Sequence, residues 1–159
     1  MQKVLLDTNK IINILKGNKQ DVSWFTEQCN KEHILFFTTP LIRHEVLRFY
    51  DYSDSNAIEY KRAEQFLSAL EIINIDKNIT DIATDIFRYE RTRYSERYQK
   101  QPDGTEKRLD KYNFDTMYVA SAMCFDLEIT SNDGDIPKIL GLYSEMIDWK
   151  EKIFNLSIS

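Results

Sequence analysis

The chain has 159 residues, of which 42% are hydrophobic and 30% are charged, a composition typical of a folded globular protein and not of a disordered one. Its 21 Lys and Arg and 26 Asp and Glu residues give a formal net charge of −5 at pH 7. This balance excludes a protein that holds nucleic acid by bulk positive charge alone, so a polyanionic substrate would need a local basic patch or bridging cations. The length predicts a single domain over residues 1–159.

Short apolar runs alternate with helical patterns along the chain. In chain order the pattern predicts a strand at 3–6, helices at 11–15 and 22–32, a strand at 34–37, helices at 41–50 and 55–70, a strand at 72–75, a helix at 78–98, a polar segment at 99–112, a helix at 114–125, a strand at 127–130 and edge structure at 146–147 and 156–158. Asp21 is expected to cap the helix at 22–32. Strands that alternate with helices predict an α/β fold with a parallel sheet and helices on both faces.

The glycines and cysteines exclude further classes. The four glycines are too widely spaced for a Rossmann or P-loop phosphate loop. The two cysteines suit a reduced protein, and the chain has neither a signal-like opening nor an apolar run of about 18 residues. We therefore expect a cytoplasmic protein that does not enter a membrane.

Acidic residues recur where the predicted strands end. Asp7 follows the first strand, and Asp133 and Asp135 follow the fourth. Asp115 lies in the first turn of the helix before the fourth strand, and Glu45 lies about five residues, roughly 7 to 8 Å, into the helix after the second strand. Because function in a parallel sheet gathers outside the carboxyl ends of the strands, we expect these five carboxylates at one edge.

Glu45 shares a helical face with Leu41 and Phe49, which we expect to face the core. A buried charge needs a partner, and no Arg or Lys in the first or fourth strand is placed to supply one. Oxygen ligands alone favour hard cations such as Mg²⁺ or Mn²⁺. The pattern therefore predicts a metal site of the kind that catalyses phosphoryl transfer.

Four segments resemble the motifs of the PIN-domain ribonucleases: Leu5–Asn9, Glu45 in its helix, Phe114–Ala122 and Thr130–Ile136. The size and the order of the motifs are similar to those of the VapC-type toxins of toxin–antitoxin pairs. The resemblance implies a PIN-like three-layer αβα sandwich with a central, mostly parallel sheet of four or five strands. It also implies a Mg²⁺- or Mn²⁺-dependent endoribonuclease that works as a homodimer and is blocked by an antitoxin protein.

Residue by residue, the resemblance implies a metal site for one or two ions and three supporting side chains. The implied ligands and catalytic residues are Asp7, Glu45, Asp115 and either Asp133 or Asp135, between which the sequence does not decide. Thr8 and Asn9 match polar positions that orient Asp7 or a metal-bound water, and Ser131 matches a hydroxyl residue near the scissile phosphate.

A charged arm at about 88–112 departs from the family pattern. It carries eight basic and five acidic residues with interleaved tyrosines, so it could hold RNA phosphates and stack bases. The candidate RNA-binding residues are Arg88, Arg91, Arg93, Arg97 and Lys111. The alternative is a solvated helix face with ion pairs three or four residues apart.

Three other functions compete with the ribonuclease. A haloacid-dehalogenase-like phosphatase is disfavoured because Asn9 stands where that class needs a second aspartate. A structure-dependent DNA nuclease shares the same metal chemistry. A non-catalytic PIN-like interaction module would show an incomplete acidic set, whereas the set here is complete.

Overall fold

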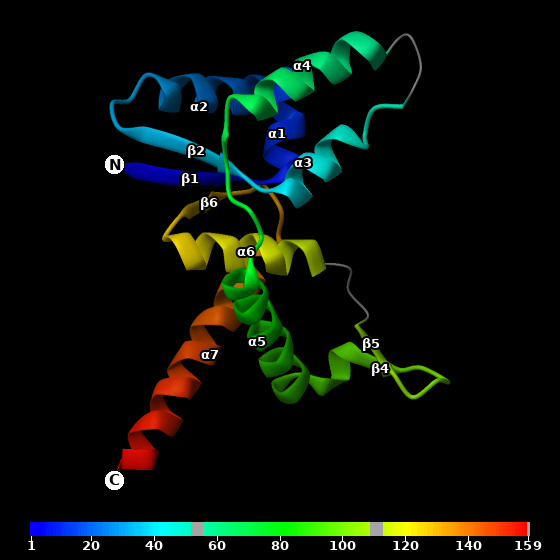
Figure 1. Ribbon diagram of the computed structural model, residues 1–159, viewed down its shortest axis with the longest axis vertical. Helices are drawn as coiled ribbons and strands as arrows, with labels where there is room; N and C mark the ends of the chain where they lie inside the picture. Colours follow the sequence, from blue (N-terminus) through cyan, green and yellow to red (C-terminus); the bar gives the residue numbers. More distant parts are fainter. Residues whose placement is uncertain (52–55, 109–112, 159) are drawn as a thin grey trace. The chain divides into compact units, whose positions relative to one another are not determined.

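The computed structural model describes residues 1–51, 56–108 and 113–158, and the chain divides into two compact units (Figure 1). The first unit comprises Met1–Asp76 and Ser121–Asp133, and the second comprises Lys77–Ala120 and Gly134–Ser159. The single domain expected from the length stays a prediction. Within the described ranges, no helix is both long and apolar enough to cross a bilayer.

The first unit is built on a parallel sheet. In the described residues this sheet has four strands in the order β3-β2-β1-β6, namely β1 (Gln2–Leu6), β2 (Ile34–Thr38), β3 (Glu71–Ile72) and β6 (Glu128–Thr130). Val4, Leu5 and Leu6 of the central strand β1 are almost fully buried, which explains why this strand reads as an unbroken apolar run. The predicted α/β fold with a parallel sheet is confirmed.

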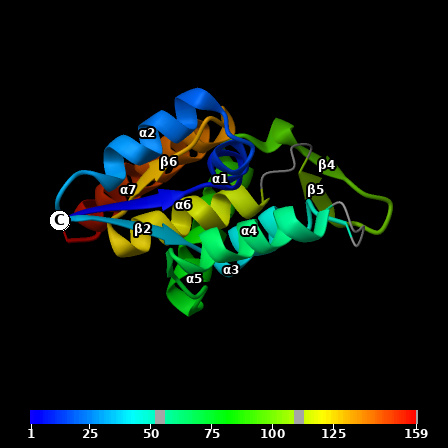
Figure 2. The same ribbon diagram turned by 90° about the horizontal axis from the view of Figure 1, so that it is seen from above.

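Four helices of the first unit accompany the sheet: α1 (Thr8–Leu15), α2 (Lys19–Cys29), α3 (Pro40–Leu47) and α4 (Ala57–Ser68). Figure 1 and Figure 2 show α2 running alongside β1 and β2. Thr39 caps α3 by accepting a bond from the backbone N–H of Ile42 (3.2 Å), with Pro40 at the first helical position. Asn18, not Asp21, caps α2, since its side chain accepts bonds from two backbone N–H groups in the first turn. The capping role expected for Asp21 is therefore wrong.

The second unit is mainly helical. It contains α5 (Lys77–Arg93), the 3₁₀ turn η2 (Ser95–Arg97), strands β4 (Tyr98–Lys100) and β5 (Glu106–Arg108), the larger part of α6 (Asn113–Phe125) and α7 (Asp135–Ile158). Helices α5 and α7 pack together. Their buried apolar side chains include Ile79, Ala83 and Ile86 on α5 and Ile136, Ile139, Leu142 and Met146 on α7.

Two expectations fail in this unit. The edge structure expected at 146–147 and 156–158 is wrong, because both segments belong to α7. Pro137 lies in the first turn of α7, where its missing N–H leaves no helical bond unmade, so it does not stop the helix. The helix expected at 78–98 ends at Arg93, and the polar segment after it forms an antiparallel β4–β5 hairpin. Three-residue strands carry too little pattern to be recognised alone.

Candidate active site

Asp7 lies directly after β1, at the carboxyl edge of the sheet. The parallel register pairs Leu6 with Thr130, so Asp7 and Ser131 are neighbours where β1 and β6 end. Asp7 is only 4% exposed, and both of its carboxylate oxygens accept hydrogen bonds. One accepts from the backbone N–H of Lys10 (2.7 Å), which makes Asp7 the N-cap of α1, and the other accepts from the Ser131 hydroxyl.

The electrostatic environment raises the pKa of the Asp7 carboxyl above its ordinary value. Burial is the main cause, because it disfavours the charged form, and the nearby Asp133 carboxylate adds to it. The bonds from Ser131 and from the Lys10 backbone act in the opposite direction. Asp7 is therefore a carboxylate that a nearby cation would stabilise.

The loop after β6 brings a second carboxylate to Asp7. The Ser131 oxygen accepts a bond from the backbone N–H of Asp133 (2.9 Å) while its hydroxyl donates to Asp7. The Asn9 amide donates to the Asp133 carboxylate (3.3 Å). Ser131 thus holds the Asp7 carboxylate, and Asn9 holds the Asp133 carboxylate.

Glu45 joins this region through Thr8. The Thr8 hydroxyl donates to the Glu45 carboxylate at 2.6 Å, and the Glu45 side chain is 17% exposed. A guanidinium nitrogen of Arg48 lies 3.6 Å from the other carboxylate oxygen. The expectation from the sequence covered only basic residues of the first and fourth strands as partners of Glu45, whereas Arg48 is the C-cap residue of α3.

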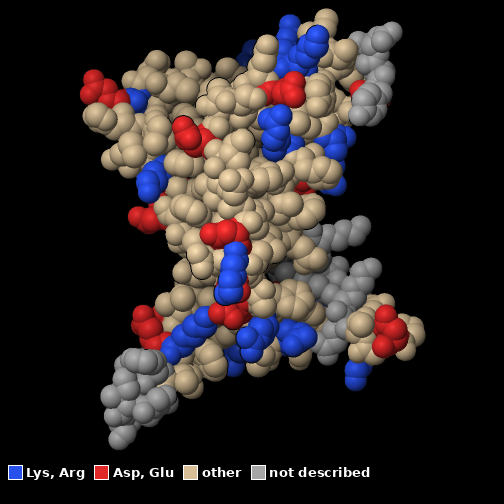
Figure 3. Space-filling model, in the orientation of Figure 1, with Lys and Arg blue, Asp and Glu red and all other residues tan. Residues whose placement is uncertain are grey.

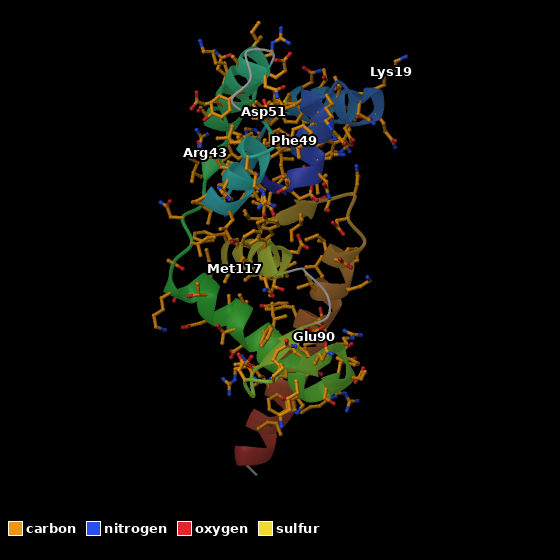
Figure 4. All side chains as sticks on the ribbon, turned by 90° about the vertical axis from the view of Figure 1, so that its right-hand side faces the viewer. Lys19, Arg43, Phe49, Asp51, Glu90 and Met117 are labelled. Carbon is orange, nitrogen blue, oxygen red and sulfur yellow. The ribbon has the colours of Figure 1, made fainter. Side chains whose placement is uncertain are left out.

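The buried face of α3 differs from the predicted one. Ile42 and Val46 are fully buried, whereas Phe49 lies beyond the end of α3 and is 53% exposed. Glu45 therefore lies beside the apolar face and not within it. Figure 4 labels Arg43 on α3 and Phe49 in the segment that follows α3.

The sequence did not reveal a buried ion pair behind the site. The Lys10 ammonium lies 2.6 Å from Asp21, with both side chains less than 10% exposed, and 4.3 Å from the centre of the Trp24 ring. The Asn132 amide lies 3.4 Å from both Asp21 oxygens, and the bond from Lys10 is the main reason why the pKa of Asp21 is lowered. The only sequence signal for this pair was a lysine directly before the apolar helix predicted at 11–15.

The remaining acidic candidates belong to the second unit. Asp115 lies half-buried in the first turn of α6, as the sequence predicts. Asp135 begins α7, and its carboxylate pairs with the Lys138 ammonium at 2.6 Å. Whether Asp115 or Asp135 joins the cluster around Asp7 stays a prediction.

Two of the candidate RNA-binding arginines have acidic partners. Arg88 pairs with Asp85 (3.6 Å), and Arg97 pairs with the buried Glu90 (2.9 Å). Arg91 and Arg93 are exposed near the end of α5. Lys111 lies outside the described residues.

The donor chemistry suits a hard cation, although no preformed cage exists in the described ranges. There, no three acidic, His or Cys side chains stand together as a ready-made metal site. The groups around Asp7 nevertheless offer only oxygen donors for a metal: two carboxylates with Ser131, and Glu45 beyond Thr8. This set fits Mg²⁺ or Mn²⁺ better than Zn²⁺.

Comparisons with known proteins place the fold. The PIN domain family matches residues 4–141. The VapBC2 complex from Rickettsia felis bound to a promoter DNA fragment contains a chain with a TM-score of 0.65 and 14% identity, covering 87% of this chain and 93% of that chain.

Two further structures are similar. The DNA-bound VapBC from Salmonella typhimurium gives a TM-score of 0.56 and 20% identity over 80% of this chain and 83% of that one. FitAB bound to the IR36 DNA fragment gives a TM-score of 0.63 and 19% identity over 86% and 89%. No curated protein sequence matches the chain. Because the family match spans most of its length and agrees with the parallel sheet, the chain belongs to the PIN domain family.

Proposed function

We propose that this chain is a Mg²⁺- or Mn²⁺-dependent endoribonuclease and the toxin of a type II toxin–antitoxin pair. The observation that carries the proposal is the joining of Asp7, Ser131 and Asp133 at the carboxyl edge of β1 and β6. Burial and the nearby Asp133 carboxylate raise the cost of ionising Asp7, and a hard cation relieves that cost. Membership of the PIN domain family supports the general nuclease chemistry.

In this proposal the metal is held by Asp7, Glu45, Asp133 and Asp115. We prefer Asp133 to Asp135, because Asp133 is bonded to Asn9 and adjoins Ser131, whereas the Asp135 carboxylate pairs with Lys138. A bound Mg²⁺ or Mn²⁺ would supply an activated water and neutralise charge on the phosphate.

The other residues hold these carboxylates in position. The Ser131 hydroxyl donates a hydrogen bond to Asp7, which orients the Asp7 carboxylate and favours its charged form. The Thr8 hydroxyl donates to Glu45 and orients that carboxylate. The Arg48 guanidinium, which is more than half exposed beside Glu45, is placed to attract a substrate phosphate at the edge of the site.

The partner is proposed from the neighbours. Two of the similar structures are described as VapBC complexes, and a further one, from Klebsiella pneumoniae, is described as a toxin–antitoxin complex. The two VapBC structures and FitAB are bound to DNA. By analogy we propose that a small antitoxin chain inhibits this protein, that the protein forms a homodimer, and that both act in the cytoplasm. Co-expression of the adjacent small reading frame, followed by co-purification and light scattering, tests the partner and the oligomeric state.

The activity is tested with purified full-length protein on a labelled RNA and on a branched DNA, with Mn²⁺, with Mg²⁺ and with chelator. We expect metal-dependent cleavage of RNA and at least a hundredfold loss in Asp7→Asn, a loss typical of removing a transition-state charge contact. Asp81→Asn is the matched control, because Asp81 is an exposed residue of α5 paired only with Lys77 among the contacts described.

Each outcome has a defined meaning. Equal cleavage by wild type and Asp7→Asn would show that the activity does not come from this site. Cleavage of branched DNA without cleavage of RNA would favour the DNA nuclease. Absence of cleavage and of any Mn²⁺-induced rise in melting temperature would favour the non-catalytic interaction module.

A further inference from the structure

The charged arm of the second unit contains a pocket, formed where α5 ends and the β4–β5 hairpin begins. It has a volume of about 750 Å³ and is lined by Arg91, Ser95, Tyr98, Lys100, Gly104 and Thr105. This volume lies within the range of about 300–1,000 Å³ that is usual for ligand sites. All of these residues belong to the second unit, so the pocket does not depend on the Asp7 cluster.

The wall of this pocket is fixed by a buried carboxylate. Glu90 on α5 is fully buried and accepts bonds from the Arg97 guanidinium (2.9 Å) and the Tyr98 hydroxyl (3.0 Å). The Tyr98 ring packs edge-on against Phe87 (5.3 Å between centroids), and Arg97 lies over the Tyr94 ring. These contacts attach η2 and the start of β4 to the end of α5, where Figure 4 labels Glu90.

The opposite wall is the hairpin turn. The backbone N–H of Gln101 donates to the Thr105 carbonyl (2.7 Å), and the Asp103 carboxylate accepts from the Thr105 backbone and hydroxyl. Gly104 has a positive φ of 84°, and nothing lies within 4 Å of where a Cβ would stand. The turn therefore presents open backbone to the pocket, which lets an extended ligand approach closely.

The charge of the lining is one-sided. Among the described side chains that line it, Arg91 and Lys100 supply a guanidinium and an ammonium, Ser95, Tyr98 and Thr105 supply hydroxyl groups, and none is acidic. The nearby carboxylates of Glu90 and Asp103 accept hydrogen bonds from Arg97, Tyr98 and Thr105. In a chain with a net charge of −5, such a lining favours an anion. Figure 3 shows further Lys and Arg side chains gathered on the second unit.

We propose that this pocket binds a backbone phosphate of single-stranded RNA, held by Arg91 and Lys100 with a hydroxyl donor from Ser95. The proposal rests on the proposed ribonuclease function and adds a substrate-holding site outside the acidic cluster. A pocket of this size accommodates a phosphate together with its flanking sugars. Arg91 and Lys100 would then raise affinity for the substrate without taking part in bond cleavage.

The test measures binding of a fluorescein-labelled single-stranded RNA to full-length protein in the inactive Asp7→Asn background. We add Arg91→Gln and Lys100→Gln, which replace two exposed side chains. We expect binding weaker by about tenfold and a salt dependence less steep by about 0.7, because the pair holds one phosphate and about 0.7 is lost for each phosphate contact with a single strand. Lys100→Gln alone should show about half of the change in slope.

Lys61→Gln with Arg62→Gln is the matched control. These exposed residues of α4 lie in the first unit and have the same types and total charge as the tested pair. Equal effects of the two pairs would overturn the proposal, since general charge would then explain the loss. Displacement of the RNA by inorganic phosphate at matched ionic strength would also overturn it, because the pocket would then be a site for free phosphate.

Kinetic measurements separate the phosphate-binding pocket from the ribonuclease function. In the active chain, Arg91→Gln with Lys100→Gln should raise KM about tenfold and leave kcat unchanged. Cleavage with unchanged KM would refute the pocket and leave the ribonuclease intact. Lack of RNA binding by the Asp7→Asn protein, together with lack of cleavage by the wild type, would refute both.

Discussion

The ion pair between Lys10 and Asp21 gives the sharpest test of how the first unit is held together. Replacing Lys10 by Met keeps the length of the side chain but leaves the Asp21 carboxylate buried beside the Asn13 and Asn132 side chains. Breaking a buried pair costs about 3 to 5 kcal/mol, and we expect about 3 because these amides remain. For a chain of this size, the melting temperature should fall by about 6 to 12 °C.

The acid dependence of this loss follows from the direction of the shift. Lys10 lowers the pKa of Asp21 in the folded state, so the stabilisation is fully present above the ordinary value of 3.8 and is lost as the pH falls through the lowered folded value. The difference between wild type and Lys10→Met should therefore be greatest near neutral pH and should shrink in acid. Urea unfolding at several pH values measures it.

Two further variants decide whether the pair is the cause. Lys19→Met removes an exposed lysine at the start of α2 (Figure 4) and should cost less than about 0.5 kcal/mol. Lys10→Met combined with Asp21→Leu should recover most of the lost stability, because no charge is then left buried. Equal losses in Lys10→Met and Lys19→Met, or no recovery in the double variant, would refute the reasoning.

Three other predictions concern the acidic cluster and the arm. Asp7→Asn should stabilise the metal-free protein near neutral pH. The pKa of Asp7 is raised in the folded state, so ionisation of this carboxyl opposes folding as the pH rises. The substitution should also reduce the stabilisation by Mn²⁺, and melting temperatures measure both effects. Thr8→Val keeps the shape of the side chain but removes the bond to Glu45, so RNA cleavage should fall by about tenfold with little change in fold as measured by circular dichroism; an unchanged rate would show that this bond does not position Glu45. Arg97→Gln should destabilise the protein by about 2 kcal/mol because Glu90 stays buried, and Arg97→Gln with Glu90→Gln should restore about half of that loss; urea unfolding that finds both variants as stable as the wild type would contradict the anchoring role of Glu90.

The sequence predicted those site residues that directly follow an apolar strand along the chain. Asp7 was found because an apolar strand stops at it, and Ser131 and Asp133 because they follow another strand of the same type. Adjacent parallel strands end at one edge, so the spatial meeting follows from topology alone. Nothing comparable marks Lys10 and Asp21, because each reads as a polar position of its own helix and only tertiary packing buries both.

The arm was less predictable for a different reason. Its charge and tyrosines were visible in the sequence, but the β4–β5 hairpin depends on pairing between segments of three residues, such as Tyr98 opposite Arg108. The helical pattern continues past Arg93, and the chain leaves it because Glu90 binds Arg97 and Tyr98. Local propensity could not reveal this, since the deciding energy is that of satisfying a buried carboxylate.

The first turn of α1 explains why so short a motif organises the whole acidic cluster. Successive helical residues point about 100° apart, so four neighbours at a helix start reach three different segments, namely the loop after β6, α3 and α2. The hydrogen bonds join Asp7 to Ser131, Thr8 to Glu45, Asn9 to Asp133 and Lys10 to Asp21. Because one backbone turn carries all four contacts, a change at any of these positions tilts the others. Paired substitutions within the turn should therefore give non-additive effects on stability and cleavage, whereas pairs that join one of these residues to α4 should add.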